Sequence, residues 1–203
     1  ERAGTLGMEG AEVRFDRTGT VTMFAGSVAH GQGHETVFKQ IVCDRLGLSP
    51  DDVEYVQGDT DKVFYGEGTG GSRSSAMGGS AFHIASERVI EKAKQFAAFE
   101  FKVDVEDVNF NDGIFSSGKT NKTLTIKEIA KNATNIAKLP PNVDAGLFAT
   151  SVYRCDFENF PNGCHVCEVE IDPDTGVTKV VRYTVVDDVG TVMTPMLLHG
   201  QIH

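Results

Sequence analysis

Two glycine-rich segments carry the polar residues whose types and spacing best suit ligand binding. The first contains Gly31, Gln32, Gly33 and His34 and leads into a stretch with helical spacing. The second covers residues 66–75, GEGTGGSRSS, and precedes another helical stretch. Glycine lets backbone N–H groups turn toward a ligand, and a helix N-terminus adds partial positive charge. The two segments therefore predict a site for an anionic group or a cofactor.

Neither glycine segment fits a nucleotide-binding signature in its sequence context. Neither contains a GxxxxGK[ST] run; the run GIFSSGKT at 113–120 has that spacing, but it begins within the expected hairpin over 107–115 and no helix is expected directly after it, so a P-loop is disfavoured. The first segment lacks the spacing GxGxxG, and GEGTGG at 66–71 has it without a clean preceding βα unit, so a nicotinamide dinucleotide fold is disfavoured. The alternative interpretation is that these glycines only make turns. The polar residues among them favour a site; they are Gln32, His34, Ser72, Arg73 and Ser74.

Composition excludes several classes of function. The 203 residues carry a net charge of −10 and are 40% hydrophobic, which indicates a globular protein and disfavours general binding to nucleic acid. No run approaches the roughly 20 apolar residues of a membrane span. The four cysteines are too few for a disulfide scaffold, so we expect a reducing compartment, the cytoplasm.

Hydrophobic periodicity predicts the elements that position these segments. A β-hairpin over 11–28 precedes the first glycine segment, and a helix ending at Gly47 and a strand over 53–56 follow it. After the second segment we expect a helix over 80–101, a hairpin over 107–115 and a helix over 126–133 begun by Thr125. A second hairpin, 164–171 with 177–186, leads to a helix that begins at Thr194 and Pro195.

These elements predict an α+β fold of mixed sheets packed against helices. The segment 135–142 contains Pro140 and Pro141 and is the best candidate for a linker. We therefore expect two parts. Residues 1–135 would hold both glycine segments, and residues 136–203 would hold the later hairpin and the start of a helix that leads to Gln201.

In order and spacing, a series of motifs resembles the molybdopterin-binding large subunit of the xanthine dehydrogenase, aldehyde oxidase and aerobic carbon monoxide dehydrogenase family. The pattern is most similar to the carbon monoxide dehydrogenase large chain. The motifs extend over nearly the whole chain and include GQGHET at 31–36, GDTD at 58–61, GTGGSRS at 68–74, GCHV at 163–166, VEIDPDTG at 169–176, DDVG at 187–190 and GQIH at 200–203.

The resemblance implies a molybdenum cofactor-binding domain that holds molybdopterin cytosine dinucleotide. Gly31, Gln32, Gly33 and His34 would bind near the metal and pterin, with Gln32 as the contact to a metal oxo ligand. The phosphate and dinucleotide tail would lie on Gly71, Ser72, Arg73 and Ser74. Asp188 and Gln201 would complete the cradle. The pterin dithiolene would hold the molybdenum, so no side chain of this chain is expected as a metal ligand.

The resemblance also implies a reaction and partners. The family oxidises carbon monoxide, an aldehyde or a heterocycle with oxygen from water and passes electrons to a 2Fe-2S small subunit and a flavin-binding medium subunit. We expect the chain to be a fragment, truncated at both ends, inactive alone and without the general-base glutamate; whether the fragment holds the cofactor by itself stays open. Gly70 departs from the aromatic residue usual in carbon monoxide enzymes, so the substrate and the presence of copper also stay open. The alternative is a cofactor-free binding or interaction domain that retains the fold.

Several cysteines and histidines could suggest a metal, redox or acid–base role but are given none. Cys164 and Cys167 are three apart on an expected strand, so their side chains point to opposite faces. Cys155 and Cys43 are interpreted as packing residues. His34 with Glu35 is not read as an acid–base pair, because Glu35 is placed to complement the helix dipole. The other histidines given no role are His30, His83 and His165.

Overall fold

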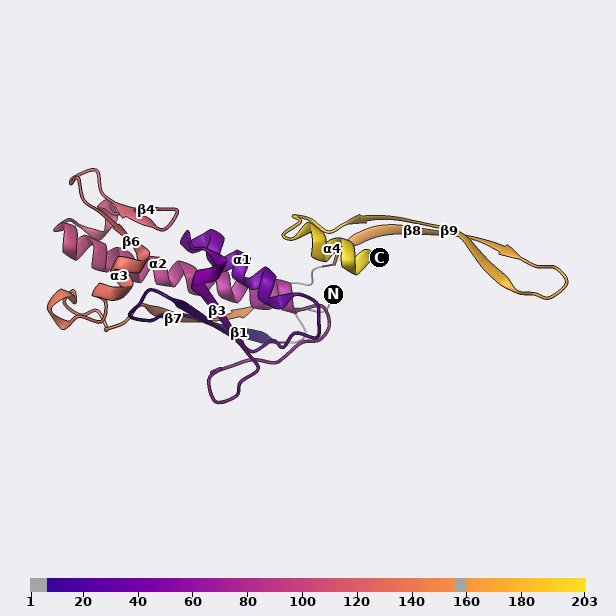
Figure 1. The fold of residues 1–203 in the computed structure, drawn as a ribbon, viewed down its shortest axis with the longest axis horizontal. Helices are drawn as coiled ribbons and strands as arrows, with labels where there is room; N and C mark the ends of the chain where they lie inside the picture. The colour runs from indigo at the N-terminus through magenta and orange to yellow at the C-terminus, as the bar shows by residue number, and fades with distance from the viewer. Residues whose placement is uncertain (1–6, 156–159) are drawn as a thin grey trace. The chain divides into compact units, whose positions relative to one another are not determined.

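The computed structural model describes residues 7–155 and 160–203 of the chain (Figure 1). These residues form two compact units, the first over 7–155 and the second over 160–203. Helices and strands alternate irregularly, with three separate sheets, which confirms the α+β class.

The first unit is built on a four-stranded sheet of order β3-β2-β1-β7. Its strands are β1 (Met8–Phe15), β2 (Val21–Ala25), β3 (Val53–Gln57) and β7 (Phe148–Arg154). β1 pairs antiparallel with β2 and β7, whereas β2 and β3 are parallel. Parallel neighbours need a crossover connection, and α1 (His34–Leu46) provides it. The expected succession of strand, glycine loop, helix and strand is confirmed.

The core lies between the sheet and the helices α1 and α2 (Ser80–Phe101). Alternate residues of β1, Val13 among them, point toward the helices, and Phe38 of α1 packs on Phe82 of α2 with ring centroids 5.2 Å apart. α1 ends as predicted at Gly47, whose φ of 65° is the left-handed conformation that glycine adopts without steric cost.

A smaller sheet of order β4-β5-β6 lies near the C-terminal end of α2 (Figure 1). It consists of β4 (Asn109–Asn111), β5 (Ile114–Ser116) and β6 (Thr123–Thr125) and is followed by α3 (Ile126–Asn132). Thr125 begins α3 as expected, in a capping box with Glu128. Short 3-10 turns occur at Pro50–Asp52, Val105–Asp107 and Ile136–Lys138.

The segment around Pro140 and Pro141 is a connection inside the first unit. It joins α3 to β7, and β7 pairs with β1 from Met8↔Arg154 to Arg14↔Phe148. The boundary that we expected between residues 135 and 136 therefore lies within this unit, because strand pairing brings the chain back to β1 after the prolines. Among the described residues, the first compact unit ends at residue 155 and the second begins at residue 160.

The second unit contains a long hairpin and a short helix. β8 (Asn162–Ile171) pairs antiparallel with β9 (Thr178–Asp188), with an irregularity between Glu168 and Val169. The turn at 172–176 joins them, as the sequence predicts. α4 (Pro195–Ile202) has Thr194 at its N-cap position and Pro195 in its first turn, also as predicted.

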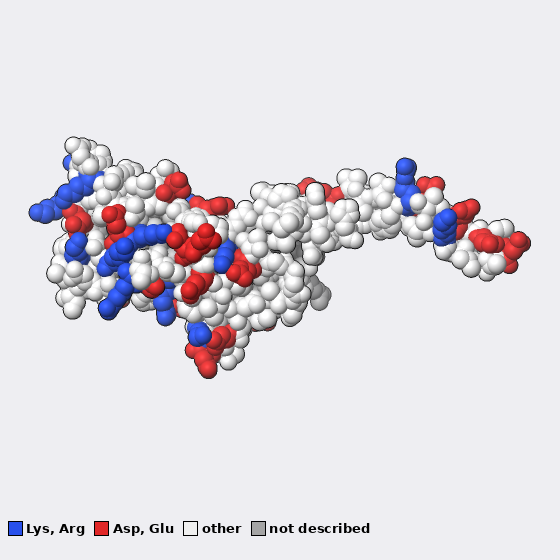
Figure 2. Space-filling model, in the orientation of Figure 1, with Lys and Arg blue, Asp and Glu red and all other residues white. Residues whose placement is uncertain are grey.

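Charged residues of both signs are interspersed over the face drawn in Figure 2. Over the end of the first unit that carries α3 and the smaller sheet, lysines and arginines alternate with acidic residues. Among the described residues, no helix combines the length and the apolar character needed to cross a membrane.

Candidate functional site

The two glycine-rich loops meet in the first unit. We define the first loop as residues 26–33, between β2 and α1, and the second loop as residues 66–73, before the turn that opens α2. Thr69 links them: its Oγ1 accepts a hydrogen bond from the backbone N–H of Val28 at 3.1 Å and donates one to the carbonyl oxygen of Val28 at 2.7 Å. Segments far apart in sequence are thereby held side by side.

Glycine makes this close approach possible. A Cβ on Gly26 would lie 2.3 Å from the Cα of Gly66, and a Cβ on Gly66 would lie 2.3 Å from the Cα of Gly26. Any side chain at either position would push the loops apart, since real Cβ atoms do not come this close to backbone. The two loops are thus in backbone contact at Gly26 and Gly66 and are joined again by Thr69 and Val28.

The first loop leaves the N-terminus of α1 open. Gly33 occupies the N-cap position in the left-handed conformation, with φ 81° and ψ 29°, and no side chain caps the helix. The first backbone N–H groups of a helix have no partner within it, so they remain available to a ligand. Nothing lies within 4 Å of a Cβ built on Gly31, which leaves open space beside the loop.

Gln32 folds back on its own loop. Its Oε1 accepts a hydrogen bond from the backbone N–H of His30, and among the described residues its amide nitrogen has no acceptor, so this N–H₂ remains able to donate to a ligand. Gln57 at the end of β3 supports the same loop, because its Oε1 accepts a hydrogen bond from the backbone N–H of Ala29 at 2.8 Å.

The second loop enters α2 through a wide helical turn. Gly68, Gly71 and Ser72 all have positive φ, and Ser74–Gly79 form a π-helical turn ahead of α2. Turns of this type are uncommon and often mark functional sites. Ser72 is exposed at the loop surface, whereas Arg73 is buried, with 1% of its surface exposed.

Buried polar atoms without partners gather at the two loops and the helices they open. Among the described residues they include His34 Nδ1, Ser27 Oγ and Ser74 Oγ. Buried polar groups are normally hydrogen-bonded, so such atoms mark places where a ligand or water would bind. Burial, followed by the nearby His30, lowers the pKa of His34, which keeps its imidazole neutral at pH 7.

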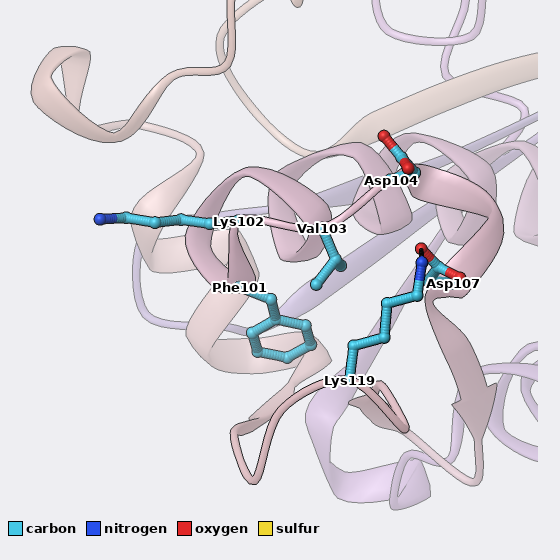
Figure 3. Close-up of a pocket in the computed structure, with 6 residues that line it drawn as sticks. All are labelled: Phe101, Lys102, Val103, Asp104, Asp107 and Lys119. Carbon is cyan, nitrogen blue, oxygen red and sulfur yellow. Dashed lines mark hydrogen bonds and ion pairs between the residues drawn. The ribbon is translucent and has the colours of Figure 1, made fainter.

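A surface pocket lies at the C-terminal end of α2, away from the glycine loops. It has a volume of about 460 Å³ and is lined by Phe101, Lys102, Val103, Asp104, Asp107 and Lys119. In Figure 3, Lys119 reaches toward Asp107, with which it forms an ion pair of 2.6 Å, and Lys102 points away. The loops open the other end of α2, whose 22 residues separate the two ends by about 33 Å. This pocket is therefore not part of the loop site.

The second unit holds the remaining expected site residues. Asp188 ends β9, and its Oδ1 accepts a hydrogen bond from the backbone N–H of Gly190 at 2.9 Å. Gln201 lies exposed in the last turn of α4. Their part in a cradle with the glycine loops stays a prediction.

The cysteines and histidines form no metal site in the part of the chain that the structure describes. Cys164 and Cys167 pair with Val186 and Tyr183 in the hairpin, and both thiols are free and exposed. His165 contacts the hydroxyl of Tyr183 at 3.3 Å and the carboxylate of Asp187 at 3.1 Å, an arrangement that the sequence did not indicate.

Sequence reasoning missed four residues that organise the loops: Glu9, Gly26, Gln57 and Thr69. Gly26 follows β2 directly and Thr69 lies among glycines, so the neighbouring sequence could have pointed to both residues. The sequence around Glu9 gave a weaker indication. It shares the inward face of β1 with Ala11 and Val13, where a charged residue needs a partner.

Known proteins resemble this chain along almost its whole length. Residues 2–203 match the family described as the molybdopterin cofactor-binding domain. The chain is 37% identical over 201 residues to the carbon monoxide dehydrogenase large chain of Afipia carboxidovorans, covering 98% of this chain and 25% of that protein.

Solved structures show the same similarity. The Cu,Mo-CO dehydrogenase in its carbon monoxide reduced state matches with a TM-score of 0.87 and 37% identity, covering 96% of this chain and 24% of that one. Quinoline 2-oxidoreductase from Pseudomonas putida 86 matches with a TM-score of 0.85 and 36% identity, covering 97% of this chain and 25% of that one. The chain thus spans about a quarter of the length of these relatives.

Proposed function

The chain belongs to the family of molybdopterin cofactor-binding domains, and we propose that its two glycine loops grip molybdopterin cytosine dinucleotide in a molybdenum-dependent oxidoreductase. The observation that carries this proposal is the junction of the loops at Thr69 and Val28, with the uncapped N-terminus of α1 and unpartnered polar atoms beside it. A cofactor with a polar pterin edge and a pyrophosphate needs many fixed donors, and these loops provide amide, hydroxyl and backbone groups.

Each loop has its own task in the proposal. Gly31, Gln32, Gly33 and His34 bind the end of the cofactor near the metal. There the amide nitrogen of Gln32 donates a hydrogen bond, and the backbone N–H groups at the start of α1 add the positive end of the helix dipole. The segment Gly71, Ser72, Arg73 and Ser74 binds the phosphate-bearing tail. Asp188 and Gln201 contribute from the second unit.

When bound, the molybdenum cofactor supplies the redox chemistry, and the residues of this chain bind and orient it. Neutral His34 suits this task, because a neutral imidazole accepts as well as donates a hydrogen bond. No side chain of this chain is assigned to the metal.

We propose oxidation of carbon monoxide, an aldehyde or a heterocycle by the complete enzyme, using water. Similarity does not choose among these substrates, because a carbon monoxide dehydrogenase and a quinoline oxidoreductase match at 37% and 36% identity. By the same analogy, a flavin-binding subunit and a 2Fe-2S subunit would receive the electrons, in the cytoplasm. The full reaction would need segments of the large subunit beyond the quarter matched here.

The test uses the complete large subunit in its assembled complex, purified from cells that make the cofactor. Molybdenum is measured directly, and cytidine monophosphate is measured after acid hydrolysis. We expect both in the wild type, a loss of about 10-fold in Gln32→Ala and no change in Gln95→Ala, an exposed position on α2. A wild-type complex without molybdenum or cytidine would contradict the proposal and favour a cofactor-free interaction domain. Unchanged content in Gln32→Ala would show that the role given to Gln32 is wrong.

A further inference from the structure

Arg73 points into the protein rather than toward the open side of its loop. Its Nη1 donates to Glu9 Oε2 at 3.0 Å and to the carbonyl oxygen of Gly68 at 2.9 Å. Its Nη2 donates to the carbonyl oxygen of Met8 at 2.6 Å and lies 3.6 Å from a carboxylate oxygen of Glu67. Arg73 and Glu9 are each 1% exposed.

This arrangement engages both terminal nitrogen atoms of the guanidinium in hydrogen bonds to the protein. Of the three nitrogen atoms only Nε lacks a partner among the described residues, and Nε is buried. The terminal N–H groups of Arg73 are therefore directed to protein acceptors and not to a phosphate outside the loop. The positive charge of Arg73 is also paired within the protein, because the carboxylates of Glu9 and Glu67 both lie against its guanidinium.

The contacts of Arg73 join the second loop to β1. Glu9 and Met8 belong to β1, whereas Gly68 belongs to the same loop as Arg73. Through this one side chain, which lies between Ser72 and Ser74 in the sequence, the loop is bound both to β1 and to its own Gly68. Fixing the residue between them sets the direction of both serines.

We propose that Arg73 is a positioning residue, which with Glu9 holds the second loop in the shape that binds the cofactor, and that the phosphate-bearing tail is bound by neutral donors. Those donors are the hydroxyls of Ser72 and Ser74 and the backbone N–H groups around them. This inference rests on the proposed function, and it replaces the direct phosphate contact that the family resemblance suggests for Arg73.

Glu9 provides the test that separates the two roles. If Arg73 bound phosphate directly, loss of the competing carboxylate in Glu9→Gln would leave cofactor binding intact or strengthen it. If Arg73 positions the loop, Glu9→Gln weakens binding of an anionic cofactor although a negative charge has been removed. We expect a loss of molybdenum and cytidine content of about 10-fold in Glu9→Gln, on the scale found for groups that orient ligand-binding residues.

A double variant separates positioning from general stability. Arg73→Met combined with Glu9→Met removes both charges and keeps apolar volume, which usually restores the stability that a single variant loses. We expect its thermal midpoint to return toward the wild type while its cofactor content stays low and amide exchange of residues 66–74 stays fast. The hairpin over 109–116 is the internal reference for exchange. Ile129→Ala, in the core at α3, is the control for lowered stability without loss of cofactor.

Three outcomes would overturn the inference: retained cofactor in Glu9→Gln, restored cofactor in the double variant, or equal cofactor loss in Ile129→Ala. The experiments use the complete large subunit in its complex. A wild-type complex without cytidine would instead refute the proposed function. Amide exchange, which needs no cofactor, would still show whether the Arg73–Glu9 pair holds the loop.

Discussion

Gly26 and Gly66 touch backbone to backbone where the two loops cross. A Cβ on either residue would lie 2.3 Å from the Cα of the other, and a Cβ on Gly26 would also lie 2.5 Å from Oε1 of Glu9. The end of β2 and the start of the second loop therefore share a space that only hydrogen atoms can occupy. The buried Arg73–Glu9 pair lies beside the same crossing, so the path of both loops depends on this contact.

Gly26→Ala should therefore separate the loops. A methyl group forced against backbone costs about 1–3 kcal/mol of folding free energy, and the displaced loops should lose most of the bound molybdenum. Gly70→Ala is the matched control, because a Cβ at Gly70 meets nothing within 4 Å. Chemical unfolding and metal analysis of the complete subunit measure both effects. Equal behaviour of the two variants would show that the crossing does not shape the site.

The hydroxyl of Thr69, rather than the shape of its side chain, should hold the two loops together. Thr69→Val keeps the shape of the side chain but removes both hydrogen bonds to Val28, at a cost of about 1–2 kcal/mol. We expect faster amide exchange over residues 26–33 and weaker cofactor retention. Thr69→Ser, which keeps the hydroxyl, should behave like the wild type. If amide exchange in Thr69→Val is as slow as in the wild type, Thr69 does not hold the two loops together.

The sequence predicted those parts of the fold that have local causes. Helix α1 follows from its hydrophobic spacing and the stop at Gly47, and α3 from the capping residue Thr125, because each signal lies within a few residues of its effect. β7 was missed because it is half exposed and lacks a regular alternation of its own. It is defined by β1, its partner from the other end of the unit.

The site likewise has parts with local causes, which the sequence predicted, and parts that depend on distant residues, which it did not. The glycine loops were recognisable because glycine and polar residues are adjacent in sequence. The inward direction of Arg73 was not, because it depends on Glu9 and Met8 across 64 and 65 positions of sequence. A long-range ion pair has no local pattern, and only the buried register of β1 hinted that Glu9 needed a partner.

His34 should make stability depend on pH. Burial lowers its pKa in the folded state below the ordinary value of 6.5, so the unfolded state binds more protons as the solution becomes acidic. The stabilising contribution is thus fully present above pH 6.5 and is lost as pH falls through the folded pKa. We expect thermal midpoints at pH 7.5 and 5.5 to differ more in the wild type than in His34→Gln. His83→Gln, at an exposed position, should keep the wild-type difference; an unchanged difference in His34→Gln would contradict the assignment.

Removing the hydroxyl of Ser74 should raise the stability of the subunit but weaken its binding of the cofactor. Its hydroxyl is buried without a partner among the described residues, and an unsatisfied group of this kind costs about 1–3 kcal/mol. Ser74→Ala should therefore raise the stability of the cofactor-free subunit by about 1 kcal/mol and lower its retention of cytidine and molybdenum. Unfolding of the cofactor-free form and analysis of the loaded form measure the two effects separately. Ser75→Ala, at the exposed neighbouring position, should change neither. A stable Ser74→Ala variant with full cofactor content would mean that the hydroxyl faces no ligand, whereas opposite changes would mark it as a donor kept unsatisfied for the cofactor.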